Sequence, residues 1–181
     1  MSIVEPRSLT YTLLMRVLGI DCGTEYTGYG VVELLEDDTL RCLCCGAVKA
    51  SPRHSMSVRL NTIFHEIDQI IQQHRPDNVA IEDVFYAVNV KSALKLGQVR
   101  GVAMLAASRA GLDVAEYSPL SSKSAVVGYG RAEKGQVQHM VARLLDLAEI
   151  PEPPDAADAL AIAICHVHTS TTLARQRVAA R

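Results

Sequence analysis

The stretch Gly19-Ile20-Asp21-Cys22-Gly23-Thr24 follows the apolar residues Val17 and Leu18 directly, and the two together decide the fold. A run of this length predicts a short buried strand over residues 16–21, and the glycine after it predicts a sharp turn at the carboxyl end of that strand. The aspartate lies at the boundary between strand and turn. Removing its charge from water costs free energy unless a partner neutralises it, so this position indicates either a turn-forming residue or part of a polar site.

Strand and helix signals alternate along the rest of the chain. Short apolar or alternating stretches predict strands over residues 27–35, 40–49, 78–82 and 113–117. Apolar residues at three- and four-residue spacings, with capping and breaking residues, predict helices over residues 55–73, 89–110, 119–127, 133–147 and 155–169. We expect the first three strands to form an antiparallel meander and helical crossovers to join the later ones. The predicted fold class is α/β, with a mixed five-stranded sheet flanked by helices.

Acids stand at the ends of two of these strands. Glu82 ends the strand at residues 78–82, as Asp21 ends the first strand. If the two strands are parallel neighbours, the chain leaves them in opposite directions and their carboxyl ends open a crevice. Asp21 and Glu82 would then lie together at that crevice. The alternative for Glu82 is a structural salt bridge.

Two further acids begin the last predicted helix, in Pro154-Asp155-Ala156-Ala157-Asp158-Ala159-Leu160. Because they are three residues apart, Asp155 and Asp158 share one face of the helix. The helix dipole explains Asp155 adequately but explains Asp158, one turn further in, less well. With Asp21 and Glu82, they favour a site for two Mg²⁺ ions, for which Mn²⁺ could substitute. Such a pair of ions would activate a water and stabilise the leaving 3′ oxygen of a phosphodiester.

The bulk composition is typical of one globular domain. The chain has 181 residues, of which 49% are hydrophobic, and this excludes a disordered protein. It shows no apolar stretch of transmembrane length and no secretory signal, so we expect no membrane association. The cysteines are odd in number and irregularly spaced, which favours reduced thiols and a cytoplasmic protein. Cys42, Cys44 and Cys45 could form a metal knuckle, but they lie in a predicted strand without a second pair at zinc spacing, which favours a structural role.

Charge is distributed unevenly, although the net charge is only −2. Residues 1–85 contain 7 Lys and Arg against 12 Asp and Glu, residues 86–143 contain 8 against 3, and residues 144–181 contain 3 against 5. A basic block between acidic flanks is typical of a surface that meets a polyanion. Ordinary scatter of solvated charge is the alternative.

A stripe of small residues runs along the helix predicted over residues 89–110. Ala93, Gly97 and Gly101 stand four residues apart and therefore share one face, which allows another backbone to approach closely. The stripe could pack against the sheet, or it could form a symmetric contact between two subunits. The sequence leaves both interpretations open.

Several stretches of the chain resemble the RuvC-type crossover junction endodeoxyribonucleases. The resemblance covers about residues 15–168, in the order and spacing of the family. It rests on residues 19–24, 27–32, 81–85, 92–98, 126–130, 132–140 and 155–161.

This resemblance implies a ribonuclease-H-like fold, a homodimer, and paired symmetric nicking of four-way (Holliday) junctions in DNA recombination and repair. It also implies handover from a RuvA–RuvB-type branch-migration complex and a T-rich cleavage preference. The catalytic and metal-binding acids would be Asp21, Glu82, Asp155 and Asp158, with Lys123 and Lys134 as basic residues near the scissile strand. Phe85 would stack at the opened junction centre, and we expect further DNA contacts from the basic block at Lys91, Lys95, Arg100 and Arg131.

The chain departs from the family pattern at a few places. Cys22 stands where the family usually has proline, and Asp83 adds a carboxylate that we expect to face away from the site because strand neighbours alternate. Residues 1–14 are expected to be a disordered extension or the product of a start at Met1 in place of Met15. We expect the nuclease domain to span residues 15–169 and a flexible basic tail to span residues 170–181.

Two other functions remain open at this point. An Asp-x-Gly-Thr motif after a first strand also occurs in sugar-kinase and actin-like ATPases, but those enzymes need two related domains and this chain has room for one. The second alternative is a module that binds junctions without cutting them. Four clustered acids argue against it, because they would repel the phosphates of a bound nucleic acid.

Overall fold

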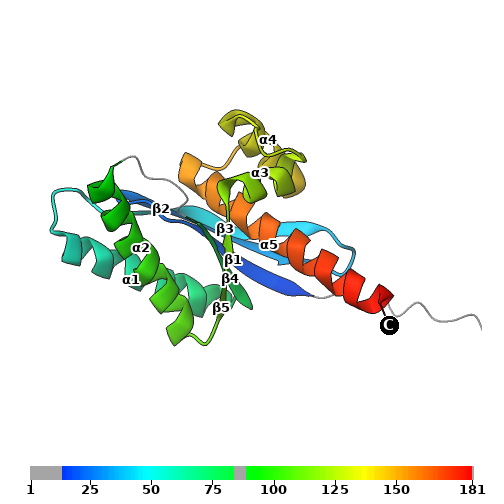
Figure 1. Cartoon of the computed structure of the whole chain (residues 1–181), viewed down its shortest axis with the longest axis horizontal. Helices are drawn as coiled ribbons and strands as arrows, with labels where there is room; N and C mark the ends of the chain where they lie inside the picture. The colour runs from blue at the N-terminus through cyan, green and yellow to red at the C-terminus, as the bar shows by residue number, and fades with distance from the viewer. Residues whose placement is uncertain (1–13, 84–88, 181) are drawn as a thin grey trace, which may run out of the picture.

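The computed structural model describes residues 14–83 and 89–180 as a five-stranded sheet with helices on both faces (Figure 1). Residues 1–13 of the expected extension, and Phe85, lie outside the described residues. The strands have the spatial order β3-β2-β1-β4-β5. They are β1 (Met15–Asp21), β2 (Tyr26–Leu34), β3 (Leu40–Lys49), β4 (Asn78–Glu82) and β5 (Asp113–Tyr117).

The pairing of the strands confirms the predicted mixed sheet. β1, β2 and β3 form the antiparallel meander, whereas β4 pairs in parallel with both β1 and β5. β1 is the central strand, and Val17, Leu18 and Ile20 are fully buried in it. Burial on both faces explains why the sequence of β1 is an almost continuous apolar run.

In the described part of the chain, five helices cover the two faces of the sheet (Figure 1). Helices α1 and α2 pack over one face, where their apolar residues join one core cluster with Leu18, Ile20 and Ile81. The other three helices build the second cluster on the opposite face. The helices are α1 (Met56–His74), α2 (Val90–Arg109), α3 (Pro119–Val127), α4 (Lys134–Leu144) and α5 (Pro154–Ala179). Within the described part of the chain, no helix is both long enough and apolar enough to cross a membrane.

Helix α5 lies unusually close to the sheet because glycines of β1 and β2 face it. A Cβ atom on Gly19 would lie 2.0 Å from the carbonyl oxygen of Ala159, and one on Gly28 would lie 2.1 Å from that of Asp155. No side chain fits at either position, so backbone meets backbone there. This close packing sets the height of the first turns of α5 above β1 and β2.

The ends of two helices differ from the prediction. Helix α4 ends at Leu144, before the expected residue 147, and Asp146 then adopts a positive φ of 50°. Helix α5 continues to Ala179, so the expected end near residue 169 was wrong. The hydroxyls of Thr169, Thr171 and Thr172 donate to carbonyls one turn earlier at 2.7–2.9 Å, so this threonine-rich stretch satisfies its polar groups within the helix.

The small-residue stripe of α2 does not pack on the sheet, so that interpretation was wrong. Gly97 and Gly101 are exposed, and added Cβ atoms would meet nothing within 4 Å. The buried face of α2 is formed by Val99, Ala103, Ala106 and Ala107. The second interpretation, a contact between subunits, stays open.

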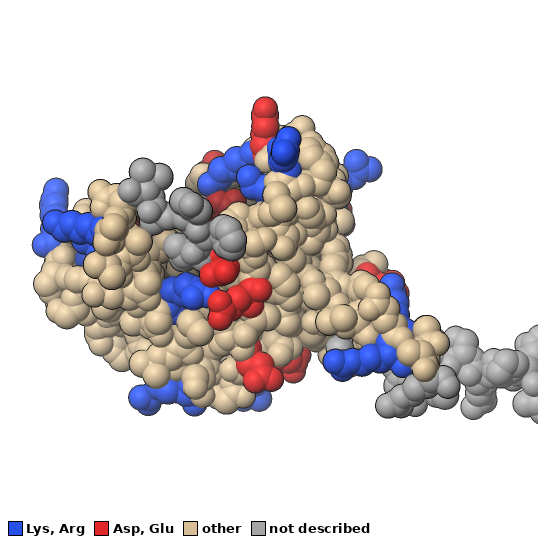
Figure 2. Space-filling model, viewed as in Figure 1, with Lys and Arg blue, Asp and Glu red and all other residues tan. Residues whose placement is uncertain are grey.

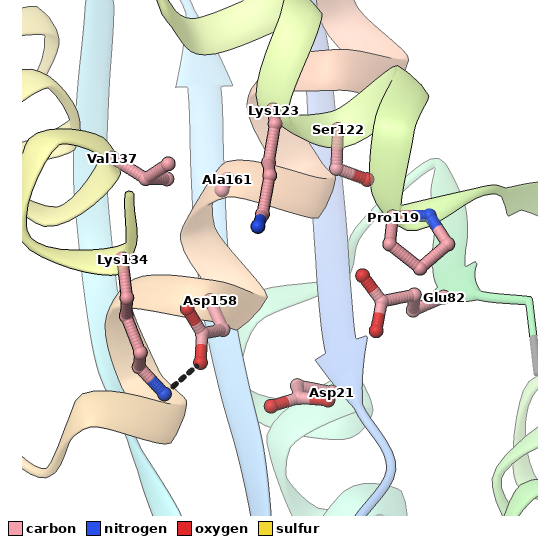
Figure 3. Close-up of a pocket in the computed structure, with 9 residues that line it drawn as sticks. All are labelled: Asp21, Glu82, Pro119, Ser122, Lys123, Lys134, Val137, Asp158 and Ala161. Atoms are coloured by element: carbon pink, nitrogen blue, oxygen red, sulfur yellow. Dashed lines mark ion pairs between the residues drawn. The ribbon is translucent and has the colours of Figure 1, made fainter. Parts of the chain in front are cut away.

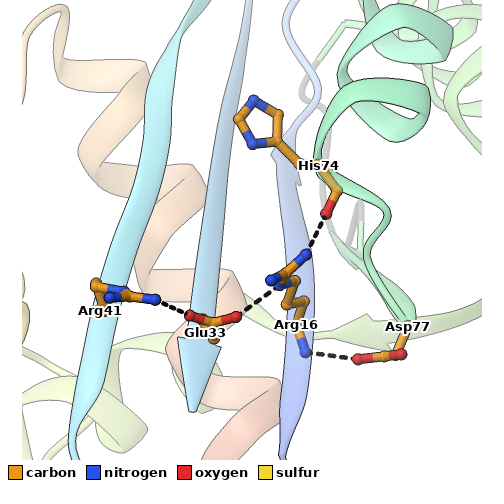
Figure 4. Close-up of polar contacts among 5 residues, drawn as sticks. All are labelled: Arg16, Glu33, Arg41, His74 and Asp77. Carbon is orange, nitrogen blue, oxygen red and sulfur yellow. Dashed lines mark hydrogen bonds and ion pairs between the residues drawn. The ribbon is translucent and has the colours of Figure 1, made fainter. Parts of the chain in front are cut away.

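A network of charged groups fastens the end of the sheet that is remote from Asp21 (Figure 4). Glu33 on β2 accepts from Arg16 on β1 at 2.6 Å and from Arg41 on β3 at 2.5 Å. The backbone N–H of Arg16 donates to the carboxylate of Asp77 at 2.7 Å, and its guanidinium donates to the carbonyl of His74 at 3.2 Å. These contacts join three strands to the turn before β4. The hydrogen bonds from Arg16 and Arg41 hold the pKa of Glu33 below its ordinary value.

Candidate active site

The parallel pairing of β1 and β4 brings two of the predicted acids together. Ile20 is in register with Ile81, so Asp21 and Glu82 occupy equivalent positions at the carboxyl ends of neighbouring strands. After these residues β1 turns toward β2, and β4 leads toward α2 on the other side. The predicted crevice at this switch point is therefore present.

The start of α5 brings the other two acids toward the same place. Pro154 begins the helix, Asp155 lies in its first turn, and Asp158 follows three residues later. Gly28 pairs with Asp21 across β1 and β2, and its missing side chain lets the backbone of Asp155 approach. The glycine therefore places the acidic face of α5 beside Asp21.

A cavity of about 270 Å³ lies between these elements (Figure 3). Asp21 and Glu82 face it from the strands, Asp158 from α5, Lys123 from α3, and Lys134 from the start of α4. The remaining lining residues are Pro119, Ser122, Val137 and Ala161. Three of the four predicted acids and both predicted lysines therefore line one cavity. Asp155 is not among the lining residues.

The electrostatics of the cavity are dominated by an excess of negative charge. Burial, together with the charges of Asp158, Glu82 and Asp155, raises the pKa of Asp21 from 3.8 to about 7. The influence of Asp155 shows that it is near the site although it does not line the cavity. Burial and the charge of Asp158 also raise the pKa of Glu82 above its ordinary value, whereas Lys123 and Lys134 act in the opposite direction.

The two lysines reach the cavity from differently capped helices. The side chain of Ser118 caps α3 by accepting from the backbone N–H of Ser121 at 3.1 Å. Glu133 and Gln136 form a capping box at the start of α4, which fixes the backbone around Lys134. The Lys134 Nζ lies 2.7 Å from the Asp158 carboxylate, and this hydrogen bond raises the pKa of Lys134.

The chemistry of the acids fits a divalent cation. Carboxylate oxygens are the ligands that Mg²⁺ prefers, and a cation would relieve the repulsion that raises the pKa of Asp21. Among residues 14–83 and 89–180, no three Asp, Glu, His or Cys side chains are grouped closely enough to hold one ion. In this arrangement the carboxylate of Asp158 pairs with Lys134. Cation binding would require the carboxylates to turn toward one another.

The raised pKa of Asp21 predicts a dependence of stability on pH and on Mg²⁺. Between about pH 4 and 7 the folded state binds more protons at Asp21 than the unfolded state, so the free energy of unfolding falls as the pH rises through this window. Above pH 7 the buried charge of Asp21 lowers the free energy of unfolding by its full amount, and a bound cation can offset this loss. We therefore expect Mg²⁺ to raise the melting temperature more at pH 8 than at pH 6.

The matched variant for this prediction is Asp21→Asn, which removes the titrating group. In the absence of Mg²⁺ it should melt at a higher temperature than the parent at pH 8 and should show a weaker decline between pH 4 and 7. Thermal melts at several pH values, with and without Mg²⁺, measure both effects. The same pH slope in parent and variant would contradict the role of Asp21.

The structure places Arg100 in an ion-pair network, and its DNA contact stays a prediction. Its guanidinium makes a short contact with Glu116 on β5 and lies 3.6 Å from the carboxylate of Asp83. Only 19% of the Arg100 side chain is exposed. Two carboxylates of the same chain therefore form ion pairs with this guanidinium. They also explain Asp83, which pairs with α2 and does not line the cavity, as predicted.

Three other predicted DNA contacts are exposed. Lys91 and Lys95 lie on the first turns of α2, and Arg131 precedes α4. On the face of the molecule that Figure 2 shows, acidic side chains lie in the middle. Basic side chains lie above them over α3 and α4 and to the left over α1 and α2. Lys91, Lys95 and Arg131 remain predictions, as does Phe85 outside the described residues.

Sequence reasoning missed Ser122 as a residue of the cavity. Its side chain is buried, and its hydroxyl donates to the carbonyl of Ser118 at 3.4 Å. The available signal was its place beside Lys123 in a helix whose start was already predicted. A serine near a helix start is most simply explained by capping, which hid its position in the cavity wall.

Carboxylates at the ends of neighbouring strands, facing lysines across a cavity in a ribonuclease-H-like sheet, define the class of metal-dependent nucleases. The family model described as "Crossover junction endodeoxyribonuclease RuvC" matches residues 17–166. The chain therefore belongs to the RuvC family of crossover junction endodeoxyribonucleases, as its sequence predicted. This membership sets aside the ATPase and the non-catalytic binding module.

Individual relatives agree with this assignment. The crossover junction endodeoxyribonuclease RuvC of Koribacter versatilis is 63% identical over 92% of this chain and 100% of its own length. The one from Heliobacterium modesticaldum is 54% identical over 87% and 96%. The solved structure of Thermus thermophilus RuvC has a TM-score of 0.80 and 36% identity over 87% of this chain and 96% of its own. A second structure, T. thermophilus RuvC in complex with a Holliday junction substrate, also has a TM-score of 0.80, at 34% identity and the same coverage.

Proposed function

We propose that this chain resolves Holliday junctions by paired symmetric nicks and that Asp21, Glu82, Asp155 and Asp158 bind two Mg²⁺ ions for that reaction. The observation that carries the proposal is the convergence of three of these acids and two lysines on one cavity. The substrate class comes from Thermus thermophilus RuvC, a relative whose complex contains a Holliday junction. Mn²⁺ would substitute for Mg²⁺ because it accepts the same oxygen ligands.

Bound Mg²⁺ would supply an activated water and would offset the negative charge that develops on the leaving 3′ oxygen. The chain itself positions the strand to be cut. Lys123 faces the cavity opposite Glu82 and can hold a phosphate oxygen of the scissile strand (Figure 3). Lys134 can exchange its Asp158 partner for a phosphate once the charge of that acid is offset. Both lysines line the same cavity as the acids. A bound phosphodiester would therefore lie between the lysine ammonium groups and the carboxylates.

The acids alone would repel DNA, so the surrounding surface must supply attraction. Lys91 and Lys95 are exposed on the first turns of α2 and Arg131 in the turn before α4, and each can contact the phosphate backbone. We also retain the proposal from the family resemblance that Phe85 stacks on an unpaired base at the junction centre.

We propose a homodimer that forms through α2. Val90, Leu94 and Leu105 are 75%, 66% and 53% exposed, and Gly97 and Gly101 lie between them on the outer part of the helix. Apolar side chains that flank exposed glycines allow a second helix to approach closely. A two-fold dimer suits a four-way junction because each subunit would nick one of two symmetric strands.

The dimer predicts the effect of Gly101→Glu. The new side chain meets no atom within 4 Å in one subunit, so the fold should be retained while a buried charge disfavours the α2 contact. Light scattering should give the 19.6 kDa monomer mass for the variant and twice that mass for the parent. Gln73→Glu on the exposed surface of α1 is the control with the same added charge. A dimeric Gly101→Glu protein would contradict this interface.

A cleavage assay tests the function itself. The purified protein should nick a synthetic mobile four-way junction symmetrically in the presence of Mg²⁺. It should leave linear duplex intact and lose activity when EDTA is added. Tight junction binding without nicks in either Mg²⁺ or Mn²⁺ would contradict the catalytic proposal. We further propose a cytoplasmic protein that receives junctions from a RuvA–RuvB-type branch-migration complex and prefers T-rich cleavage sites, in line with the family resemblance.

A further inference from the structure

A pair of thiols on β3 lies outside the nuclease site. The register of β2 and β3 is Val31 with Cys44 and Val32 with Cys42, which leaves Leu43 as an extra residue in a β-bulge. In a regular strand, residues three apart point to opposite faces. The bulge changes this alternation, so Cys42 and Cys45 both pack on the face covered by α5, whereas Leu43 and Cys44 pack on the opposite face.

The two side chains on the α5 face lie close together. The bulge places Cys42 and Cys45 side by side on this face, where both pack against the same core cluster and their side chains interact. Both residues are half-buried, and β3 is an edge strand of the sheet. The two thiols are therefore neighbours that remain partly accessible to solvent.

This interaction separates the acidities of the two thiols. It lowers the pKa of Cys45 to about 7 because the Cys42 thiol donates to the Cys45 thiolate. The same interaction raises the pKa of Cys42. Burial raises the pKa of Cys22 to about 12 and that of Cys44 and Cys165 to about 11. At neutral pH, Cys45 is therefore the thiol of these five with the largest thiolate fraction, and the thiolate is the nucleophile.

A metal knuckle does not explain the pair. Within the described ranges, no group of three His, Cys, Asp or Glu is arranged to hold a metal ion, so the two thiols have no third ligand. Two neighbouring thiols, one of which has a lowered pKa, have the arrangement of a reactive dithiol.

We propose that Cys42 and Cys45 are a redox modification site, which low-molecular-weight disulfides convert to an intrachain disulfide. The Cys45 thiolate attacks one sulfur of the oxidant, forms a mixed disulfide and releases one thiolate. Cys42 then loses its proton to solvent and attacks the Cys45 sulfur, which releases the second thiolate. The two protein thiols lose two electrons and two protons in total, and the oxidant is reduced to two thiols.

Intact-mass spectrometry of the full chain with oxidised glutathione at neutral pH tests this site. The parent should lose the mass of two hydrogens, and two fewer cysteines should then react with iodoacetamide. Cys42→Ser should stop at one glutathione adduct on Cys45, because the resolving thiol is absent. Cys45→Ser should form neither product over the same time.

The matched control is Cys44→Ser, which changes a half-buried thiol on the opposite face of the same strand. It should be oxidised like the parent. A second measurement needs no variant: under limiting iodoacetamide, Cys45 of the parent should be alkylated at least about tenfold faster than Cys165. A parent that forms no intrachain disulfide, or a Cys44→Ser protein that loses the reaction, would overturn the proposal. Neither readout depends on nuclease activity.

Discussion

Asp158→Asn should reduce junction cleavage by at least about 10³-fold and leave junction binding intact. Asp158 lies at the centre of the charge arrangement, because it raises the pKa of both Asp21 and Glu82 and pairs with Lys134 at 2.7 Å. The amide keeps the size of the side chain but removes its charge, so the proposed site would lose affinity for a cation. Binding should be retained or strengthened, since one source of repulsion toward phosphates is gone.

The control for this variant is Asp146→Asn. Asp146 is exposed, does not line the cavity, and has a positive φ that asparagine also tolerates. Asp146→Asn makes the same chemical change as Asp158→Asn. The variant protein should cleave junctions at a rate within about twofold of the parent, as expected for a surface substitution. Single-turnover cleavage with Mg²⁺ and fluorescence anisotropy without it separate the chemical step from binding. If Asp158→Asn cuts at the rate of the parent, Asp158 is not part of the catalytic site.

The sheet and the position of its acids could be predicted because both depend on local patterns. β3, β4 and β5 have the predicted bounds, since each is a short stretch bounded by turn or helix signals. Parallel pairing of β1 and β4 was the condition of that prediction, and the structure confirms it, with Asp21 beside Glu82. The acids of α5 followed from helical spacing alone.

The environment of Arg100 could not be predicted in the same way. Its partners, Asp83 just after β4 and Glu116 on β5, are far apart in the sequence, and the contact depends on the rotation of α2 about its own axis. Charge counting identified a basic block but could not separate paired from free cations. The same rotation decides that Val99 and Ala103 are buried while Gly97 and Gly101 are exposed.

The β-bulge at Leu43 is a second feature that the sequence did not reveal. Alternation in a regular strand would have placed Cys42 and Cys44 on one face and Cys45 on the other. One extra residue reverses this arrangement, and only the observed register with β2 locates it. The reactive pair therefore depends on a backbone irregularity that has no clear signature in the composition of β3.

Gly28→Ala should have the second large effect, on stability and on cleavage together. The added Cβ would lie 2.1 Å from the carbonyl oxygen and 2.5 Å from the carbonyl carbon of Asp155. These are backbone atoms, so no side-chain rotation relieves the clash and the start of α5 must move. We expect a loss of about 2–4 kcal/mol in the free energy of unfolding, as for overpacking against a rigid neighbour.

Cleavage by the folded Gly28→Ala protein should fall by at least about 10²-fold, because the moved helix carries Asp155 and Asp158 away from Asp21. Gly135→Ala is the matched control, since its Cβ would meet nothing within 4 Å and lies in a helix, where alanine is favoured by about 0.5–1 kcal/mol. Denaturant melts and single-turnover rates below the transition measure the two effects separately. A Gly28→Ala protein with lower stability but the cleavage rate of the parent would show that close packing of α5 on β2 supports the fold without positioning the acids.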